Sequence, residues 1–419
     1  MPSTALLTDL YELTMAQAYL EAGKQGRAVF SLFVRELPPR RNFLVACGLE
    51  PLVRALENFK FGKEELSYLK SLGLFKDWFL DYLEEYRFKG DLYAIPEGRI
   101  VFQKEPLLQV EGPLPEVQIV ETLVINTLHY STLVASKAAR CYIASGGKTL
   151  IDFGLRRAHG PDAGLHGARA CYIAGFAGTS NLLAGKEYAL PVFGTMAHSF
   201  VMVFEEEEEA FRAFAKSFPD RAVLLIDTYD AVEGAKRALK LMREGVKVVG
   251  LRIDSGGVEK LSKQVKKIFQ ESNFGHIKIV VSGGVEERSI QRWLSRGAPI
   301  DVFGVGTKVL TSSDAPYLDM AYKLVEYEGR PKVKKSPGKK TFPYKRQVLR
   351  HYEGGYMTYD EVLPYREGGM VELVCKDGEL VKPLPKVRDI RETFMEDLSR
   401  LPPELKSLDR KLKYRVLLV

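Results

Sequence analysis

Three segments decide the fold of this chain: KVVGLRIDSGG (247–257), IKIVVSGGV (277–285) and IDVFGVGTK (300–308). Each is a short apolar run that ends in glycine, serine or an acidic residue. Helical patterns at 258–269 and 286–297 separate them. Because short strands that alternate with helices are typical of parallel sheets, the pattern predicts a parallel α/β sheet or barrel.

The same rhythm extends toward the N-terminus. Further strands are predicted at 149–153 and 222–227, with a helix at 234–244. Polar residues follow each strand, as in DFGLR (152–156) and DTYD (227–230). The carboxyl ends of barrel strands carry the active site, so these residues define where a site is expected.

The flanking regions have a different pattern. Before the alternating region we expect a helix at 10–22 with Thr8 or Asp9 as its N-cap, a strand at 27–34, helical residues at 48–86 and short strands at 88–111. Pro115 opens a long helical pattern that reaches about residue 145. Beyond Ser313 we expect short strands and a final amphipathic helix.

Composition excludes several classes of protein. The 419 residues are 46% hydrophobic and 27% charged, with a net charge of +7, which is ordinary for globular domains and unlike disordered, collagen-like or membrane proteins. The N-terminus lacks the features of a secretory signal. The four scattered cysteines form no Cys-x-x-Cys pair, so a cytoplasmic location is expected.

Two glycine loops are the strongest local signal for function. SGG (282–284) and GVGT (304–307) end two consecutive predicted strands. Glycines there let backbone N–H groups approach a phosphate closely, and barrels often place phosphate sites after their last two strands. The alternative is a pair of tight turns; the pairing of the loops favours phosphate binding.

Other candidate residues have structural alternatives that the sequence leaves open. Asp254 could hold a cation or a ribose diol, or it could cap the next helix. Arg156 and Arg252 could pair with a carboxylate or phosphate of a ligand, or with Asp152 and Asp254. His198 has no distinguishing local pattern of its own.

A basic segment is the one candidate for nucleic-acid binding. Residues 330–350 contain nine basic residues and no acidic one, with Phe342 and Tyr344 among them. A solvated loop, or a lid over a phosphate-rich substrate, is the interpretation we favour, because no RNA-binding module accompanies the segment.

A series of motifs then resembles one known family. They are LTDLYELT (7–14), DFGLR (152–156), FAGTS (176–180), GTMAH (194–198), LRIDSG (251–256), VSGGV (281–285), FGVGTK (303–308) and KRQV (345–348). In this order they are similar to nicotinate phosphoribosyltransferases, over all but about the last sixty residues. Each motif alone is weak, but the ordered series is specific.

The resemblance implies a fold and an activity. The fold is an irregular α/β barrel with a second α+β domain built from N- and C-terminal segments, divided here as 1–125, 126–320 and 321–419. The activity is ATP-coupled and ligase-type: nicotinate and phosphoribosyl pyrophosphate give nicotinate mononucleotide and pyrophosphate in NAD salvage, while ATP gives ADP and phosphate. A homodimer with its active site at the subunit interface is implied, without nucleic-acid or membrane partners.

The resemblance also implies roles for individual residues. His198 matches the histidine that is transiently phosphorylated, and Asp254 would fix the ribose hydroxyls or Mg²⁺, which otherwise enters with the substrate. Nicotinate would stack between Phe153 and Tyr11, the latter from the partner subunit. The remaining implied contacts are Arg156, Ser180, Thr195 and Arg252 to nicotinate, and Gly283, Gly284, Gly304, Gly306 and Thr307 to the phosphoribosyl group.

One position helps to choose the substrate. Nicotinamide-using relatives carry Asp where this chain has Ser180. A carboxylate there would repel the carboxylate of nicotinate, whereas a serine hydroxyl can donate to it. Ser180 therefore favours nicotinate over nicotinamide.

Two departures and three alternatives remain, one of the alternatives being an unrelated barrel enzyme that acts on a sugar phosphate, which the glycine loops permit. The chain has Pro343-Tyr344 where the family pattern has Pro-Gly, and it lacks the cysteine-rich zinc knuckle of some relatives, so no zinc is expected. The same-class alternative is a nicotinamide or quinolinate phosphoribosyltransferase. The different-class alternative is a basic RNA-binding or scaffold protein that retains a degenerate barrel.

Overall fold

The computed structural model describes residues 5–334 and 342–419, which form two compact units. The first unit comprises the chain up to Ser136 together with Ala315–Val419, and the second comprises Lys137–Asp314. The division falls within helix α6 (Glu121–Ser145).

The second unit is built on a six-stranded parallel sheet, with strand order β7-β6-β11-β10-β9-β8. Its strands are β6 (Thr149–Asp152), β7 (Gly178–Thr179), β8 (Val223–Leu225), β9 (Gly250–Ile253), β10 (Lys278–Val281) and β11 (Val302–Val305). Its helices are α7 (Pro161–Ile173), α8 (Leu182–Tyr188), α9 (His198–Met202), α10 (Glu207–Ser217), α11 (Ala231–Arg243), α12 (Val258–Glu271), α13 (Glu287–Ser295) and α14 (Thr307–Leu310), with a 3₁₀ turn at Leu155–Arg157.

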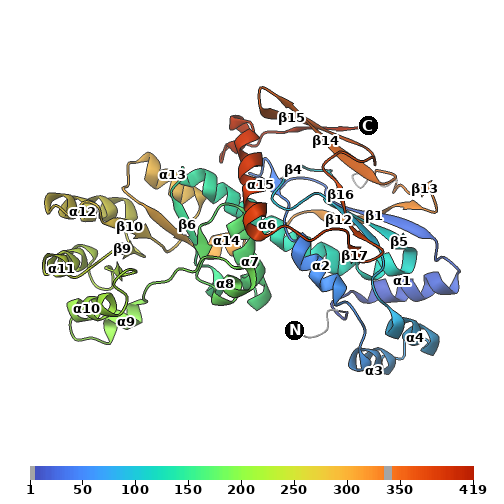
Figure 1. The fold of residues 1–419 in the computed structure, drawn as a ribbon, viewed down its shortest axis with the longest axis horizontal. Helices are drawn as coiled ribbons and strands as arrows, with labels where there is room; N and C mark the ends of the chain where they lie inside the picture. The colour runs from blue at the N-terminus through green and yellow to red at the C-terminus, as the bar shows by residue number, and fades with distance from the viewer. Residues whose placement is uncertain (1–4, 335–341) are drawn as a thin grey trace. The chain divides into compact units, whose positions relative to one another are not determined.

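Parallel register brings the carboxyl ends of the strands together. Val281 of β10 pairs with Ile253 of β9 and with Phe303 of β11. In Figure 1, α11 and α12 flank β9 and β10 within this unit. The predicted mixed α/β fold with a parallel sheet is confirmed, and five of its strands were predicted. β7 was missed because its two residues are too few to produce a pattern in the sequence.

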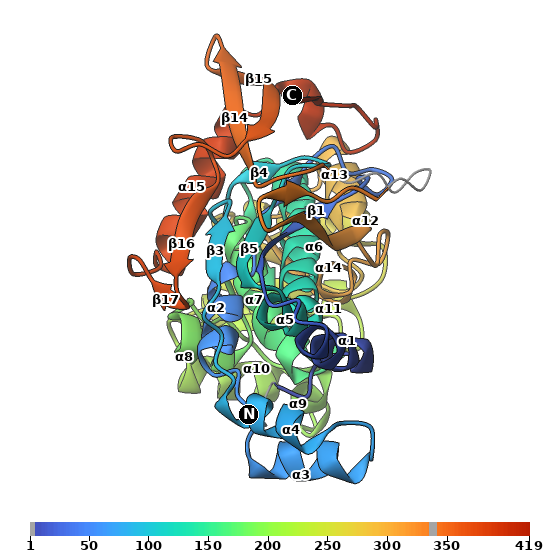
Figure 2. The same ribbon diagram turned by 90° about the vertical axis from the view of Figure 1, so that its right-hand side faces the viewer.

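The first unit contains a seven-stranded sheet in the order β13-β12-β1-β5-β3-β16-β17, and Figure 2 shows β3, β5 and β1 side by side. These strands are β1 (Arg27–Val34), β3 (Asp91–Ala94), β5 (Leu108–Pro113), β12 (Met320–Tyr327), β13 (Arg330–Pro331), β16 (Glu372–Lys376) and β17 (Glu379–Leu380). A three-stranded sheet joins β14 (Arg346–Glu353), β15 (Tyr356–Pro364) and β18 (Arg415–Leu418), and β2 (Leu44–Val45) pairs with β4 (Ile100–Val101).

The helices of the first unit surround a large apolar core. They are α1 (Leu10–Glu21), α2 (Leu49–Glu57), α3 (Lys63–Ser71), α4 (Asp77–Glu85), α5 (Leu114–Ile119) and α15 (Val387–Arg400), with a 3₁₀ turn at Pro403–Lys406. Leu52, Phe79 and Val117 are among the fully buried core residues. The expected amphipathic helix is present as α15, but it is not the last element, because the 3₁₀ turn and strand β18 follow it.

The long helix predicted from Pro115 is interrupted at Val120, and a buried carboxylate explains the break. In a continuous helix the Thr122 amide would donate to the carbonyl four residues earlier. It donates instead to Glu12 Oε1 of α1 at 2.8 Å. Burial raises the pKa of Glu12 to about 7. A contact from a residue 110 positions away could not be read from the local pattern.

One N-terminal expectation also needs correction. Asp9 occupies the N-cap position of α1, but its side chain makes no capping bond and accepts from Thr122 Oγ1 at 2.8 Å. The acidic run 205–209 leads into the first turn of α10, and most of it is exposed. Within it, Glu207 is buried and accepts from Arg237 at 2.7 Å, which offsets the cost of burying its charge.

The KRQV motif lies in the first unit, where it ties strands together. Lys345 Nζ donates to Glu111 at 2.8 Å and lies 3.8 Å from the ring centre of Tyr93. The Gln347 amide is buried and bonds the backbone of Arg366 and Val371. We infer a structural reason for this motif, since its side chains are used within the sheet.

Tyr344 explains the departure from the Pro-Gly pattern. Its φ is +67°, in the left-handed region that glycine adopts readily and other residues adopt at a cost of about 1 kcal/mol. Tyr344 therefore occupies a backbone conformation that the glycine of the family pattern could adopt readily. The basic segment 330–350 includes residues 335–341, and the predicted lid or nucleic-acid role of those residues lies outside the described part of the chain.

No helix in the described residues is both long and apolar enough to cross a bilayer. The four cysteines are buried and unoxidised.

Candidate functional site

The carboxyl edge of the parallel sheet gathers most of the residues predicted to be functional. Arg252 and Asp254 end β9, Ser282 follows β10, and Asp227 follows β8. Ser282 Oγ donates to Asp254 Oδ1 at 2.5 Å, which joins two adjacent strand ends. Asp254 is not a helix cap, because Gly257 occupies the N-cap position of α12.

His198 lies at the start of α9, close to this edge. Its Nδ1 is 3.2 Å from Thr228 Oγ1, and its Nε2 is 4.0 Å from Asp254 Oδ2. The second distance is too long for a hydrogen bond but close enough for electrostatic attraction. More than a third of the His198 side chain is exposed, and Thr228 is the hydrogen-bond partner of the ring, so its Nε2 side is open to a ligand.

Arg252 and Thr195 form a second group at the same edge. Arg252 donates to Thr195 Oγ1, and its Nη2 is 3.9 Å from Asp254 Oδ1. The guanidinium is largely buried, which lowers its pKa, while Asp254 and Asp227 oppose that shift. Its buried Nε has no hydrogen-bond partner among the described residues. Such a donor is costly unless a ligand accepts from it.

Asp227 is a site residue that the sequence analysis did not single out. Its Oδ2 accepts from the amides of Asp254 and Ser255, both at 2.8 Å, and from Ser255 Oγ at 2.9 Å. Its buried Oδ1 has no partner in the described part of the chain. Its place directly after β8, opening the polar cluster 227–230, was the available signal.

Gly283 permits a very close approach between two strand ends. Its φ is +77°, and a Cβ placed there would lie 1.9 Å from the backbone oxygen of Asp254. Gly284 also has a positive φ, +65°, but nothing lies within 4 Å of its Cβ position. The first glycine is therefore required by packing, whereas the second is required by conformation alone and faces open space.

Gly304 and Gly306 make room for Phe153. A Cβ on Gly304 would lie 2.5 Å from the Phe153 ring, and one on Gly306 would lie 2.8 Å from the Phe153 carbonyl oxygen. The Phe153 amide donates to Val305 at 2.8 Å. These glycines thus position an aromatic ring at the strand ends, and Gly306 also precedes Thr307, the first residue of α14.

A buried carboxylate supports the ends of β6 and β7. Asp152 accepts from Thr179 Oγ1 at 2.6 Å and from the Gly154 amide at 2.8 Å. Burial raises the pKa of Asp152 to about 6, although the two hydrogen bonds act to lower it. The Ser180 amide donates to the Asp152 carbonyl at 2.8 Å, which fixes Ser180 beside the same strand end.

The two arginines after β6 are exposed. Arg157 reaches Thr307 Oγ1 at 3.4 Å and thereby links the β6 loop to the residue after Gly306. Sequence reasoning selected Arg156 and missed Arg157, although both belong to the pattern LRR. Neither pairs with Asp152, whose oxygens are used by Thr179 and Gly154.

A buried ionic cluster anchors the loops that contain the glycines. Lys137 has a fully buried side chain and lies 2.6 Å from Glu287 and 2.8 Å from Asp314. Arg140 donates to Glu287 at 3.0 Å. Lys308, which follows GVGT, bonds Glu286, which follows SGGV, at 2.7 Å. Because a paired buried charge is costly to separate, this cluster fixes both glycine loops.

Tyr11 belongs to the first unit, on α1. Its side chain is 45% exposed, which leaves the ring available to a ligand. Partial burial and nearby Glu121 raise its pKa, so the phenol stays protonated.

The edge of the sheet can accept a divalent cation and an anion. Asp254 and Asp227 are carboxylates near one another, and Asp227 Oδ1 is buried without a partner, which fits the oxygen ligands that Mg²⁺ prefers. The described residues contain no group of three or more His, Cys, Asp and Glu side chains arranged to hold a metal ion. Any Mg²⁺ would therefore complete its coordination with substrate oxygens and water.

Models of one protein family match nearly the whole chain. The N-terminal domain of nicotinate phosphoribosyltransferase matches residues 6–129, the nicotinate phosphoribosyltransferase family model matches 149–356, and the C-terminal domain matches 345–419.

Individual relatives agree with these matches. A nicotinate phosphoribosyltransferase of Mycobacterium tuberculosis is 43% identical over 413 residues, covering 97% of this chain and 89% of the relative. One from Bacillus subtilis is 38% identical over 455 residues, covering 99% and 92%. The crystal structure of human nicotinic acid phosphoribosyltransferase superposes with a TM-score of 0.88 at 29% identity, covering 98% of this chain and 97% of that one.

Proposed function

Because the chain belongs to the nicotinate phosphoribosyltransferase family, we propose that it makes nicotinate mononucleotide with ATP coupled through a phosphohistidine at His198. The general activity follows from membership of this family: the chain is a phosphoribosyltransferase of NAD biosynthesis that acts on nicotinate. The proposal of ATP coupling rests on the position of His198, which lies between Thr228 and Asp254 at the strand ends.

Nicotinate binding is assigned to the aromatic and cationic groups. The pyridine ring stacks on Phe153, whose ring is accommodated by Gly304 and whose backbone is accommodated by Gly306. The nicotinate carboxylate pairs with Arg252, whose Nε lacks a partner in the described residues, and with Arg156 and Ser180. Thr195 orients the guanidinium by accepting from it.

The phosphoribosyl donor is assigned to the glycine loops. Its 5-phosphate accepts from backbone amides of Gly283, Gly284 and Gly306 and from Thr307. Asp254 fixes the ribose hydroxyls, or with Asp227 it would hold a Mg²⁺ ion. Such an ion would neutralise the charge of the leaving pyrophosphate. In the transfer, the bond from the ribose carbon to pyrophosphate breaks as the bond to the pyridine nitrogen forms.

ATP coupling is assigned to His198. A ring nitrogen attacks the γ-phosphorus of ATP, the bond to ADP breaks, and the phosphoryl group stays on the ring until water removes it as phosphate. Thr228 and Asp254 set the orientation of the ring. The experiment measures ADP formed per nicotinate mononucleotide. A ratio near one supports coupling, whereas product formation without ADP contradicts it.

A homodimer with an interface active site is part of the proposal. Large apolar side chains are exposed around α8 and α9 of the second unit: Leu182, Leu183, Phe193, Met202 and Val203. Exposed apolar groups concentrated in this way favour burial against another chain. Tyr11 of the partner copy would then cover the second face of nicotinate. A reducing, cytoplasmic location is part of the same proposal, since none of the four buried cysteines is placed in a disulfide.

Replacing Ser180 by Asp is expected to shift substrate preference toward nicotinamide. The new carboxylate repels nicotinate and accepts from the amide of nicotinamide. The ratio of kcat/KM for nicotinamide over nicotinate should rise about tenfold or more, which corresponds to ~1.4 kcal/mol. Ser180→Asn, of similar size but neutral, is the matched control. An unchanged ratio in Ser180→Asp would contradict the assignment.

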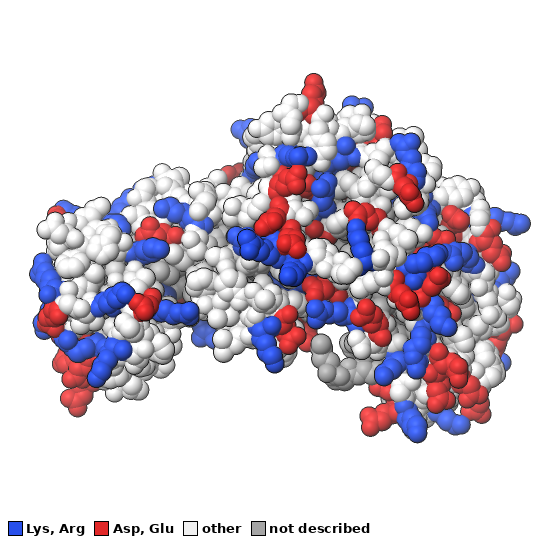
Figure 3. Space-filling model, in the orientation of Figure 1, with Lys and Arg blue, Asp and Glu red and all other residues white. Residues whose placement is uncertain are grey.

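The RNA-binding alternative lacks support on the surface. On the face shown in Figure 3, acidic and basic side chains of the described residues are intermixed within each unit rather than collected in one basic stripe. The described residues on that face therefore do not favour a nucleic-acid backbone over a small anionic substrate.

A further inference from the structure

The first unit contains a cavity of about 270 Å³ that the proposed reaction does not use. Three segments far apart in the sequence line it: residues 36–41, 102–104 and 411–414. Four basic side chains contribute to its wall, Arg41, Lys104, Lys411 and Lys413, against one carboxylate, Glu36. The cavity is therefore strongly positive, whereas the chain as a whole carries only a modest excess.

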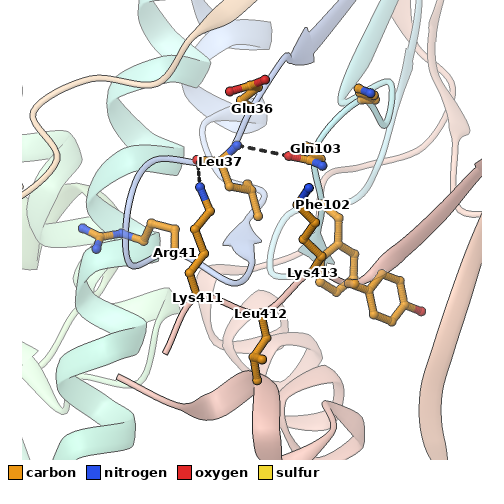
Figure 4. A pocket seen from close by; sticks show the side chains of 10 residues that line it. Glu36, Leu37, Arg41, Phe102, Gln103, Lys411, Leu412 and Lys413 are labelled. Carbon is orange, nitrogen blue, oxygen red and sulfur yellow. Dashed lines mark hydrogen bonds between the residues drawn. The ribbon is translucent and has the colours of Figure 1, made fainter. Parts of the chain in front are cut away.

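Side chains along residues 411–413 point alternately to opposite sides, and this places two lysines on the same side. Lys411 and Lys413 extend to the same side, toward Leu37 and Gln103, while Leu412 turns the other way (Figure 4). Side chains two residues apart in an extended chain share one side and lie roughly 6–7 Å apart at their origins. Lys411 Nζ also donates to the Leu37 carbonyl at 3.2 Å, so its ammonium group is held at the cavity.

The backbone that presents these lysines is fixed on both sides. The Leu412 amide donates to Asn42 Oδ1 at 2.9 Å, and the buried Asn42 amide group donates to the carbonyls of Leu405, Ser407 and Arg410. Tyr414 stacks on Phe102 with ring centres 3.8 Å apart, and its hydroxyl donates to Asp360 at 3.0 Å. The lysines therefore need little ordering when a ligand binds.

The remaining basic groups are also held in place. Arg41 is 1% exposed, and a guanidinium stays charged even when buried. Lys104 has a φ of +69°, a conformation that costs a non-glycine residue energy, and its amide donates to Val34 at 2.7 Å. A basic residue in a costly backbone conformation in the cavity wall is a feature that function can explain.

We propose that this cavity is a second anion site, separate from the sheet edge, that binds a compact phosphate or diphosphate group. Two ammonium groups on one side, together with Lys104 in the cavity wall, match an anion with several oxygens. Ligand pockets for larger organic molecules usually start at about 300 Å³, so the volume favours a free inorganic anion over a whole nucleotide.

The test is calorimetric titration of the full chain with pyrophosphate, in the wild type and in the double variant Lys411→Gln/Lys413→Gln. The wild type should show two classes of site, and the double variant should lose one of them or bind there at least tenfold more weakly. Lys413→Gln alone, which keeps the Lys411 hydrogen bond to Leu37, should weaken the same site without altering the melting temperature.

The matched control is Lys263→Gln/Lys267→Gln on α12, which removes the same charge from exposed positions elsewhere. It should retain both classes of site. Two unchanged classes of site in the Lys411/Lys413 variant would overturn the proposal, as would a wild type with a single class. Binding of ADP but not of pyrophosphate at the affected site would overturn the assignment to a compact anion.

Discussion

Replacing His198 by alanine is expected to abolish covalent labelling by γ-labelled ATP and to remove the ATP-stimulated part of the rate. The ring nitrogen that would accept the phosphoryl group is lost, and no other histidine ring is described between Thr228 and Asp254. We expect the ATP-stimulated kcat to fall ~10²-fold or more, because loss of a nucleophile removes its whole pathway. The measurements are acid-labile phosphoryl incorporation and product formation with and without ATP.

The control is His276→Ala, which removes another exposed histidine. It should retain labelling and ATP stimulation at wild-type levels. Labelling that persists in His198→Ala would contradict the assignment, and so would an undiminished response of that variant to ATP. Binding of nicotinate should be nearly unchanged in His198→Ala, since the groups assigned to nicotinate are elsewhere.

The second large effect is expected at Gly283. A Cβ there would lie 1.9 Å from the Asp254 backbone oxygen, so the loop after β10 must move away from β9. That movement displaces both the amides assigned to the 5-phosphate and the carboxylate assigned to the ribose. The KM for phosphoribosyl pyrophosphate should rise about a hundredfold in Gly283→Ala, equivalent to ~2.7 kcal/mol.

The variant Gly284→Ala distinguishes the effect of steric overlap with Asp254 from the cost of placing alanine at a positive φ. Both glycines have a positive φ, so both variants carry a strain of roughly 1–2 kcal/mol. Only Gly283 meets a neighbouring atom, so Gly284→Ala should change the KM less than about tenfold. The melting temperatures of both variants measure the destabilisation that this backbone strain causes in each. Equal KM values for the two variants would contradict the close approach as the reason for Gly283.

Much of the second unit was predictable, because its strands and helices follow local periodicity. The glycine loops, Arg252 and Asp254 could be assigned to one edge, since parallel strands end together. Asp227 was harder to identify: its carboxylate acts through backbone amides of the next strand end, a contact that leaves no trace in the local sequence. Arg157 was overlooked for a similar reason, because its partner Thr307 is 150 residues away.

The first unit depends more heavily on distant contacts. The break between α5 and α6 results from Glu12, and the turn before KRQV is kept by a tyrosine in a conformation typical of glycine. The basic cavity combines residues 36–41 with 411–414, nearly the two ends of the chain. The sequence pattern singled out residues 330–350 instead, because a continuous run of basic residues can be recognised in a sequence. Lysines that are far apart in the sequence and close only in the fold cannot be recognised in this way.

The most direct measurement of the central claim is pyrophosphate release from phosphoribosyl pyrophosphate and Mg²⁺ with nicotinate, nicotinamide or quinolinate, each with and without ATP. We predict release with nicotinate, increased by ATP, and little release with the other two compounds. Preference for nicotinamide or quinolinate would contradict the assignment of Ser180 and Arg252. Release with nicotinate that ATP leaves unchanged would contradict the role of His198.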